Sequence, residues 1–315
     1  MVNGTVVCYQ LKNASCIQIY NFAFLLWIEC MILSFHPCID ADLNAIVAGR
    51  PPGSEEESMV KRADAIILPQ GVRQDLYDLC RKYATRVFPN YDLRFQRPGK
   101  IGDISLFRTA AVPHPKTFLF QNVADYHSHF PAEEYRFPFP FPFVIKGNYG
   151  GEGRMVYRIR CAKEMQAIID QLGAMETSGT RGFIIQQWID HGGRDVRVVV
   201  LHDRLISYWR VQRDPRQFLT NLSAGGTIDL HSDDHLLEKA EEIVHHFCKQ
   251  TSINLAGIDL MFDKDDESKK PLFLEINYWF GRRFFGSSEA YYAELKTAVK
   301  RWLATFDPDW ANHIR

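Results

Sequence analysis

Short apolar runs alternate with amphipathic segments over the first third of the chain. The runs that predict strands lie at residues 5–9, 31–35, 65–68 and 87–88. Apolar residues at helical spacing predict a helix over Gln74–Tyr83. A helical turn is expected within residues 40–48 and a loop at residues 51–57. Strands that alternate with helices are typical of a parallel sheet, so residues 1–97 are expected to form a small α/β domain.

A second set of elements follows residues 90–99, a segment without periodicity that we take as the domain boundary. Helices are predicted over residues 101–109, 161–172, 235–250 and 288–305. Strands are predicted over residues 117–120, 143–146, 155–159, 183–189, 196–201, 205–211, 256–262 and 272–277. The strands at 143–146 and 155–159, and those at 256–262 and 272–277, are close enough in sequence to form hairpins. We therefore predict an α+β domain over residues 98–315.

Two stretches of unusual composition suggest roles outside a folded core. The apolar run at residues 22–35 is 14 residues long and contains Glu29, whereas a membrane-spanning helix needs about 20 apolar residues. It also lacks the features of a secretory signal, so we expect a pair of buried strands. Residues 137–143 alternate phenylalanine with proline, which cannot donate to a strand ladder. A packed lead-in to the next strand is the preferred interpretation, and a docking peptide is the alternative.

The charge balance and the cysteines limit the partners and the compartment. The chain has 37 basic and 38 acidic residues and a net charge of −1, so no global field draws it to nucleic acid or an anionic membrane. Its seven cysteines are scattered and form no C-x-x-C pair, which argues against a zinc site or a disulfide scaffold. We expect reduced thiols in a cytoplasmic protein without a nucleic-acid or membrane partner.

A glycine-rich loop is the first candidate for chemistry. Gly147, Gly150, Gly151 and Gly153 allow a tight loop whose N–H groups face an anion. The loop is not a Walker A loop, because no G-K-[ST] follows, and it leads into a strand, whereas a dinucleotide fingerprint opens a helix. Lys146 ends the preceding apolar strand, and a lysine there needs an anionic partner such as a phosphate. A plain glycine-rich turn is the alternative.

Acidic residues inside two apolar strands form the second candidate. Asp259 interrupts one strand, and Glu275 and Asn277 share a face of the other because they are two residues apart. If the strands pair, two carboxylates and an amide oxygen come together. These are hard ligands of the kind that Mg²⁺ takes beside nucleotide phosphates. The alternative is that the acids are ion-paired with Lys146 or with an arginine.

The order of these features resembles the ATP-grasp superfamily, in particular its RimK-like (ribosomal-protein glutamate ligase-like) branch. The resemblance covers about residues 95–285 and rests on an ordered set of segments: GKIGDISLFRTAAVPHP, FPFVIKGNYGGEG, FIIQQWIDHGGRDVRVVVL, NLSAGG, AGIDLMF and PLFLEINYWFG. It implies an ATP-grasp fold of two α+β lobes, preceded by a small α/β pre-ATP-grasp domain.

The resemblance also implies roles for single residues. It implies ATP and Mg²⁺, or Mn²⁺, as cofactors. Lys100 and Lys146 would contact the nucleotide from the two lobes, with Gly150 and Gly151 of the glycine loop near the phosphates. The other implied nucleotide ligands are Gln187, Trp188 and Ile189 for adenine, Asp195 for the ribose and Asn221 for the phosphates or a metal. Magnesium would be held by Asp259, Glu275 and Asn277.

Three positions depart from the family pattern. Gln187 stands where the family often has glutamate, and Leu219 stands where it usually has arginine. Arg210, Arg213 or Arg216 is then expected to supply the missing charge. The loop after Asn277 is usually small residues, whereas here it reads YWFGRRFF. Gly281 is expected to turn this loop over the site, so Arg282 and Arg283, together with Arg210, are the catalytic candidates that would neutralise a transferring phosphoryl group. The alternative for the loop is a pair of exposed arginines that flank an aromatic core plug.

The expected reaction is ligation of a carboxylate to an amine at the cost of ATP. A phosphorylated carboxylate has a good leaving group, which the free acid lacks. The expected partners are a small-molecule or peptide carboxylate and an amine such as an amino acid, and a homo-oligomer is compatible with the sequence. Two alternatives stay open: an ATP-grasp small-molecule kinase, and a nucleotide-binding module without turnover.

Overall fold

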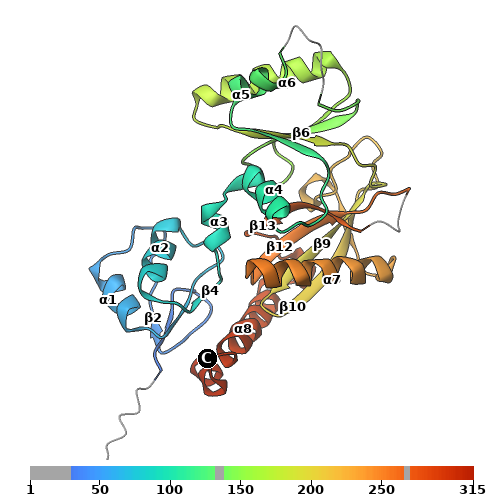
Figure 1. Cartoon of the computed structure of the whole chain (residues 1–315). Coiled ribbons are helices and arrows are strands. Elements are labelled where there is room, and N and C mark those ends of the chain that lie inside the picture. Colours follow the sequence, from blue (N-terminus) through green and yellow to red (C-terminus); the bar gives the residue numbers. More distant parts are fainter. Residues whose placement is uncertain (1–29, 132–137, 266–269) are drawn as a thin grey trace, which may run out of the picture. The chain divides into compact units, whose positions relative to one another are not determined.

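The computed structural model describes residues 30–131, 138–265 and 270–315. The strand expected at residues 5–9 and most of the apolar run at 22–35 lie outside these ranges. Within them, no helix is long and apolar enough to cross a membrane. The α+β class is confirmed: three sheets of four, five and four strands are combined with helices (Figure 1).

The first sheet is parallel, with strand order β2-β1-β3-β4. Its elements in chain order are β1 (Ile32–Ser34), β2 (Leu43–Asn44), α1 (Ser54–Arg62), β3 (Ala65–Ile67), α2 (Gln74–Tyr83) and β4 (Val87–Phe88). Every residue of β1 and β3 is buried, as expected of central parallel strands. The chain passes from β1 to β2 on one side and to β3 on the other, which makes the β1–β3 boundary the topological switch point of this sheet.

Two local predictions in this region are wrong. Residues 40–48 contain strand β2 and not a helical turn, because the Asn44 side chain bonds both backbone groups of Ala41 and holds the segment open beside β1. The expected loop at 51–57 contains the start of α1. There the Glu56 carboxylate accepts from the Gly53 N–H, and three acids occupy the first turn, where the helix dipole favours negative charge.

Two helices connect this sheet to the rest of the chain. They are α3 (Asp92–Gln96) and α4 (Gly99–Thr109), so the segment expected to lack structure at residues 90–99 is partly helical. Helix α4 buries Ile104, Leu106 and Phe107 in the main core. The predicted domain boundary at residues 97 and 98 lies between these helices and stays a prediction.

The second sheet forms a small lobe with order β5-β8-β6-β7 and antiparallel pairing. Its elements are β5 (Thr117–Phe120), α5 (Val123–His129), β6 (Phe143–Gly147), β7 (Val156–Ile159), α6 (Ala162–Thr177) and β8 (Phe183–Gln187). Phe139 and Phe141 of the phenylalanine–proline stretch pack against its core, in agreement with a packed lead-in to β6. His127 and His129 lie in α5, which Asn122 caps by accepting from the Asp125 N–H.

The third sheet is the base of a larger lobe, with antiparallel order β11-β10-β9-β12-β13. Its elements are β9 (Arg194–Leu201), β10 (Arg204–Val211), β11 (Thr227–Asp229), α7 (Asp234–Thr251), β12 (Leu255–Met261) and β13 (Leu272–Asn277). Helix α7 covers one face (Figure 1), where Val196, Val198 and Val200 of β9 are fully buried. Arg197, which lies between Val196 and Val198 along β9, points to the opposite face.

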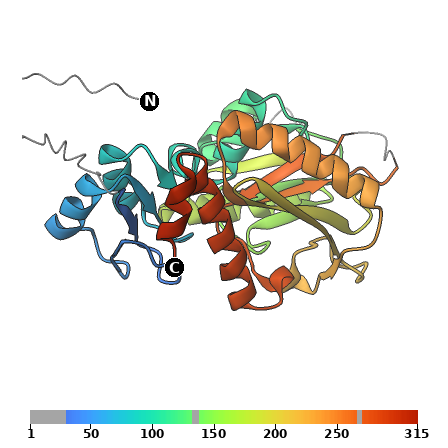
Figure 2. The same cartoon turned by 90° about the horizontal axis from the view of Figure 1, so that it is seen from below.

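The last helix, α8 (Ser288–Ala304), lies between the first sheet and the large lobe (Figure 2). Its Trp302 ring is 5.4 Å from the ring of Phe88 at the end of β4, and its Tyr291 hydroxyl is 3.5 Å from the side-chain oxygen (Oε1) of Gln70. A short 3₁₀ segment, Pro308–His313, follows α8. The C-terminal helix therefore packs directly against the N-terminal sheet.

Candidate active site

A cavity of about 410 Å³ lies between the sheets of the small and large lobes. Its volume is in the range of ligand-binding pockets. Of the site residues predicted from the sequence, all but Arg282 line it: Lys100, Lys146, Gly150, Gly151, Gln187, Trp188, Ile189, Asp195, Arg210, Asn221, Asp259, Glu275, Asn277 and Arg283. Residues from both lobes and from positions 100 to 283 therefore converge on one space.

The register of the large sheet places a row of polar side chains on the floor of the cavity. Tyr208 of β10 is paired with Arg197 of β9, Arg197 with Asp259 of β12, and Asp259 with Glu275 of β13. Directly paired residues on one face of a sheet are close enough to interact. A bulge between Asp259 and Leu260 shifts the register of β13 beside the row. Four strands thus present alternating functional groups side by side.

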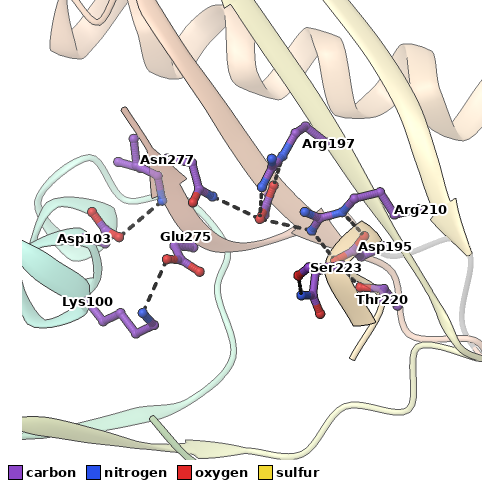
Figure 3. A network of polar contacts seen from close by, with 12 residues as sticks. Lys100, Asp103, Asp195, Arg197, Arg210, Thr220, Ser223, Glu275 and Asn277 are labelled. Carbon is purple, nitrogen blue, oxygen red and sulfur yellow. Dashed lines mark hydrogen bonds and ion pairs between the residues drawn. The ribbon is translucent and has the colours of Figure 1, made fainter. Parts of the chain in front are cut away.

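Asp259 lies between two arginines, Arg197 and Arg210, both of which are labelled in Figure 3. Its carboxylate accepts two hydrogen bonds of 2.7 Å from Arg197 and lies 3.0 Å from the Arg210 guanidinium. The Asn277 amide also donates to it at 3.0 Å. Burial raises the pKa of Asp259, but the two guanidinium groups outweigh this and bring that pKa below its usual value. For Asp259, the structure realises the ion-paired alternative.

The Asp195 carboxylate is also bound by an arginine. Arg210 binds both of its oxygens, at 2.8 and 2.5 Å, and the Thr220 hydroxyl donates at 2.7 Å. Asp195, Arg210 and Thr220 are all buried. Arg210 therefore joins Asp195 to Asp259, and a ribose hydroxyl would have to share an oxygen that already accepts hydrogen bonds.

The two lysines of the cavity have different surroundings. Lys100 is buried, lies 3.3 Å from Glu275 and donates to the Gly150 carbonyl at 3.0 Å. Lys146 donates to the side-chain oxygen of Gln186 (Oε1) at 2.8 Å, and the side-chain Nε2 of Gln186 donates in turn to the Thr117 hydroxyl at 3.0 Å. Removal from water lowers the pKa of Lys146 to about 8. Its ammonium lacks a close carboxylate partner among the described residues, so it is available to an anionic ligand.

Two loops meet above these lysines. Gly153 has a φ of +77°, and a Cβ built there would lie 2.6 Å from Leu219 Cδ1 and 3.4 Å from Asn221 Oδ1. Leu219, the residue that replaces the expected arginine, thus packs against the glycine loop. Asn221 Oδ1 is buried without a hydrogen-bond partner in the described residues. A buried acceptor of this kind suits a metal ion or a donor group of a ligand.

The segment that joins the lobes offers free backbone groups. The Gln187 N–H is bonded to the Lys116 carbonyl at 2.9 Å, so it is not available for adenine. No hydrogen bond is formed by the N–H groups of Trp188 and Ile189 to any part of the chain that the structure describes. The Arg158 guanidinium lies 5.2 Å from the Trp188 ring and 5.3 Å from the Phe218 ring, and both rings line the cavity.

The aromatic loop after β13 separates its two arginines. Arg283 faces the cavity and donates to the Leu222 carbonyl at 3.4 Å. Arg282 lies outside the cavity lining, which disagrees with its predicted place in the site, and donates to the Tyr292 hydroxyl of α8 at 2.7 Å. In this loop Gly286, and not Gly281, has a positive φ, at +77°; the turn expected at Gly281 stays a prediction.

The residues present fit magnesium in part. Glu275 keeps 30% of its side chain exposed and has only Lys100 as an ion-pair partner in the described chain, so a carboxylate oxygen is available. Asn277 and the unpartnered Asn221 oxygen add neutral oxygen ligands. Asp259, by contrast, is neutralised by two arginines, and its bond to Asn277 suits it to hold that side chain in place.

Sequence reasoning missed three contributors to this site. Arg197 is two residues after Asp195 on β9, so strand alternation could have placed it on the same face. Gln186, which holds Lys146, faces the cavity although it precedes the segment expected to bind adenine. Trp279 is 70% exposed at the cavity wall, and no local pattern predicts this.

Solved structures share the arrangement of lobes. The ADP complex of N5-carboxyaminoimidazole ribonucleotide synthetase matches 76% of this chain and 60% of its own, with a TM-score of 0.55 and 12% identity. A RimK-domain ATP-grasp protein from Sphaerobacter thermophilus matches 74% of this chain and 80% of its own, with a TM-score of 0.52 and 15% identity. The structure therefore has the ATP-grasp fold.

The family follows from the sequence. A model of the RimK-like ATP-grasp domain matches residues 99–289, so this chain belongs to the RimK-like ATP-grasp family. The glutamate–LysW ligase ArgX of Sulfurisphaera tokodaii is 32% identical over 106 residues, which cover 32% of this chain and 38% of that protein. A probable α-L-glutamate ligase of Xanthomonas euvesicatoria is 28% identical over 135 residues, 42% of each chain. The chain spans about two fifths of the length of these curated relatives.

Proposed function

We propose that this protein is an ATP-dependent carboxylate–amine ligase. The observation that carries the proposal is the cavity between the lobes, which combines a glycine loop, two lysines and an acidic strand that ends in Glu275 and Asn277. The relatives named as glutamate ligases support the reaction class. We further infer that residues 98–315 carry the nucleotide site and that residues 1–97 form the preceding domain.

The proposed reaction has two steps. A carboxylate oxygen of the acid substrate attacks the γ-phosphorus of ATP, the bond to the β–γ bridging oxygen breaks, and ADP leaves. The amine then attacks the acyl carbon, phosphate leaves with the C–O bond electrons, and the amine loses a proton. Lys146 and Arg283 supply the positive charge that faces the transferring group, since neither has a close carboxylate among the described residues.

A magnesium ion fits this site through Glu275, Asn277 and Asn221. When bound, it would offset charge on the nucleotide phosphates. In this proposal Asp259 holds Asn277, and Arg197 holds Asp259, so both act on the site through their neighbours.

The test is a screen for ADP release with Mg-ATP over amino acids, peptides and peptide C-termini, each with and without an added amine. Release that requires both a carboxylate and an amine, together with an amide product in the mass spectrum, supports ligation. Release with a hydroxyl compound alone would instead show a kinase. A melting temperature unchanged by saturating Mg-ATP would refute the nucleotide site, because a ligand at 100 times its Kd stabilises by about 2.7 kcal/mol.

A further inference from the structure

The carboxyl edge of the first sheet is a second place where functional groups collect. Strands β1 and β3 end here, at the switch point of a parallel sheet, where such folds commonly bind ligands. His36 follows β1, and Gln70 and Gly71 follow β3. The aromatic loop and α8 lie against the same edge: a Cβ added to Gly71 would be 2.0 Å from the Trp279 ring. Trp279 also lines the nucleotide cavity, so this side chain borders both the edge and the cavity.

Arg282 supplies a cation at this edge. Its guanidinium lies 4.7 Å from the ring centres of both Tyr291 and Tyr292 and donates to the Tyr292 hydroxyl at 2.7 Å. No carboxylate of the described chain forms an ion pair with it. One hydrogen bond leaves most of the five guanidinium N–H groups without a partner in those residues. An arginine fixed by two aromatic rings and not neutralised is well placed to bind an anion.

His36 adds a neutral donor. Its Nδ1 accepts from the Cys38 N–H at 3.1 Å, so the proton of the neutral ring is on Nε2. Burial and the positive charge of Arg282 lower the pKa of His36 to about 4, so the ring is neutral at physiological pH. The ring lies 5.5 Å from Tyr292, the residue that holds Arg282.

Gln70 adds a buried donor without a partner. The side chain is 4% exposed, and its Nε2 forms no hydrogen bond with the described residues. Its carbonyl oxygen is 3.5 Å from the Tyr291 hydroxyl, which places the amide beside the ring that carries Arg282. A buried amide without a partner is costly unless a ligand satisfies it.

We propose that Arg282, His36 and Gln70 form a subsite for an oxyanion of the substrate, with Trp279 as the wall between this subsite and the nucleotide. All three groups are donors, so the subsite selects a group rich in acceptor oxygens and excludes an ammonium. The proposal rests on the proposed ligase function. The non-reacting anionic group of the substrate would bind at this edge, while the reacting carboxylate of the same substrate lies in the cavity. A carboxylate and a phosphate share the required chemistry.

The test measures anion binding and does not depend on turnover. The full chain, saturated with Mg²⁺ and a non-hydrolysable ATP analogue, is titrated with L-glutamate, succinate and inorganic phosphate at constant ionic strength in a calorimeter. Arg282→Met is expected to weaken binding of the preferred anion at least about tenfold, since bonds to charged groups are the strong ones. Gln70→Leu is expected to weaken it several-fold. The preference of the unaltered protein for glutamate or phosphate distinguishes the two anions.

Controls separate binding from folding. Arg301→Met removes a surface arginine that pairs with Asp203 and should leave anion binding unchanged. Arg282→Lys keeps the charge and should recover part of the affinity. Nucleotide affinity should be the same in all variants. Equal anion affinity in Arg282→Met and the unaltered protein, or no saturable binding of any of the three anions, would overturn the subsite. ADP release is measured separately, so failure of the ligase proposal has its own signature.

Discussion

Replacing Asp259 by asparagine tests whether this acid is structural or binds the metal. Asp259 is 5% exposed and is the sole acidic partner of Arg197 among the described residues, whereas Arg210 keeps Asp195. Breaking a buried ion pair on one side costs about 3–5 kcal/mol. The retained Asp195 pair places the loss near the lower end. For a chain of this size, about 3 kcal/mol lowers the melting temperature by roughly 5 °C.

The matched variant is Glu275→Gln. The Glu275 side chain is 30% exposed and lies 3.3 Å from Lys100, which keeps its bond to the Gly150 carbonyl, so its loss should destabilise the fold less than the loss of Asp259. Both variants are unfolded in urea without nucleotide, and then melted with and without Mg-ADP. We expect Asp259→Asn to lose stability in the free protein, and Glu275→Gln to lose chiefly the magnesium-dependent gain from ADP.

A double variant completes the thermodynamic cycle. Removing both partners, in Arg197→Met with Asp259→Leu, should cost less than the two single changes together, because neither charge is left unpaired. If Asp259→Asn is as stable as the unaltered protein and loses only the magnesium-dependent gain, Asp259 is a metal ligand and the structural role is wrong.

Three further predictions concern the same cavity. The pKa of Lys146 is lowered to about 8, and a bound phosphate favours its ammonium form, so ADP binding should take up protons near pH 8 and weaken as the pH rises through that value. Calorimetry in buffers of different ionisation enthalpy measures this proton uptake, which Lys146→Met should abolish. Gly153→Ala should weaken ADP binding strongly, because φ is +77° and Leu219 blocks the Cβ, whereas Gly151→Ala, with no protein atom within 4 Å of the added Cβ, should leave the melting temperature of the free protein unchanged. Arg283→Met should lower turnover by about 10²-fold or more with little change in ATP affinity, and normal turnover would show that the loop only packs.

Several elements could be predicted because each has its whole apolar pattern within its own short stretch of sequence. Helix α2 and strands β4, β5 and β13 have the predicted bounds, since each carries an unbroken apolar run or face. Strand β2 and helices α1, α3 and α5 were missed. They are short, and side-chain bonds at their ends decide their structure, such as the bond of Asn122 to the Asp125 N–H.

The residues that line the cavity could be predicted, but the ion pairs among them could not. Asp259 and Glu275 could be placed on one face because both strands and their turn lie close together in the sequence. The partner of Asp259 depends on which strand lies on its other side. That strand is β9, which begins more than sixty residues earlier and brings Arg197. Local patterns contain no information about this pairing, so the ion pair and the metal site could not be separated in advance.

Neighbouring residues of the same charge take different roles in this protein because their surroundings differ. Asp259 and Glu275 are paired across two neighbouring strands, yet one is neutralised by two guanidinium groups and the other faces a single lysine. Arg282 and Arg283 are consecutive, yet one lies against two tyrosines and the other faces the cavity. In each pair, the side chain of one residue is held by its neighbours in the fold, and the charge of the other is left to bind a ligand. Neighbouring groups with such different surroundings are the usual basis for dividing roles in an active site.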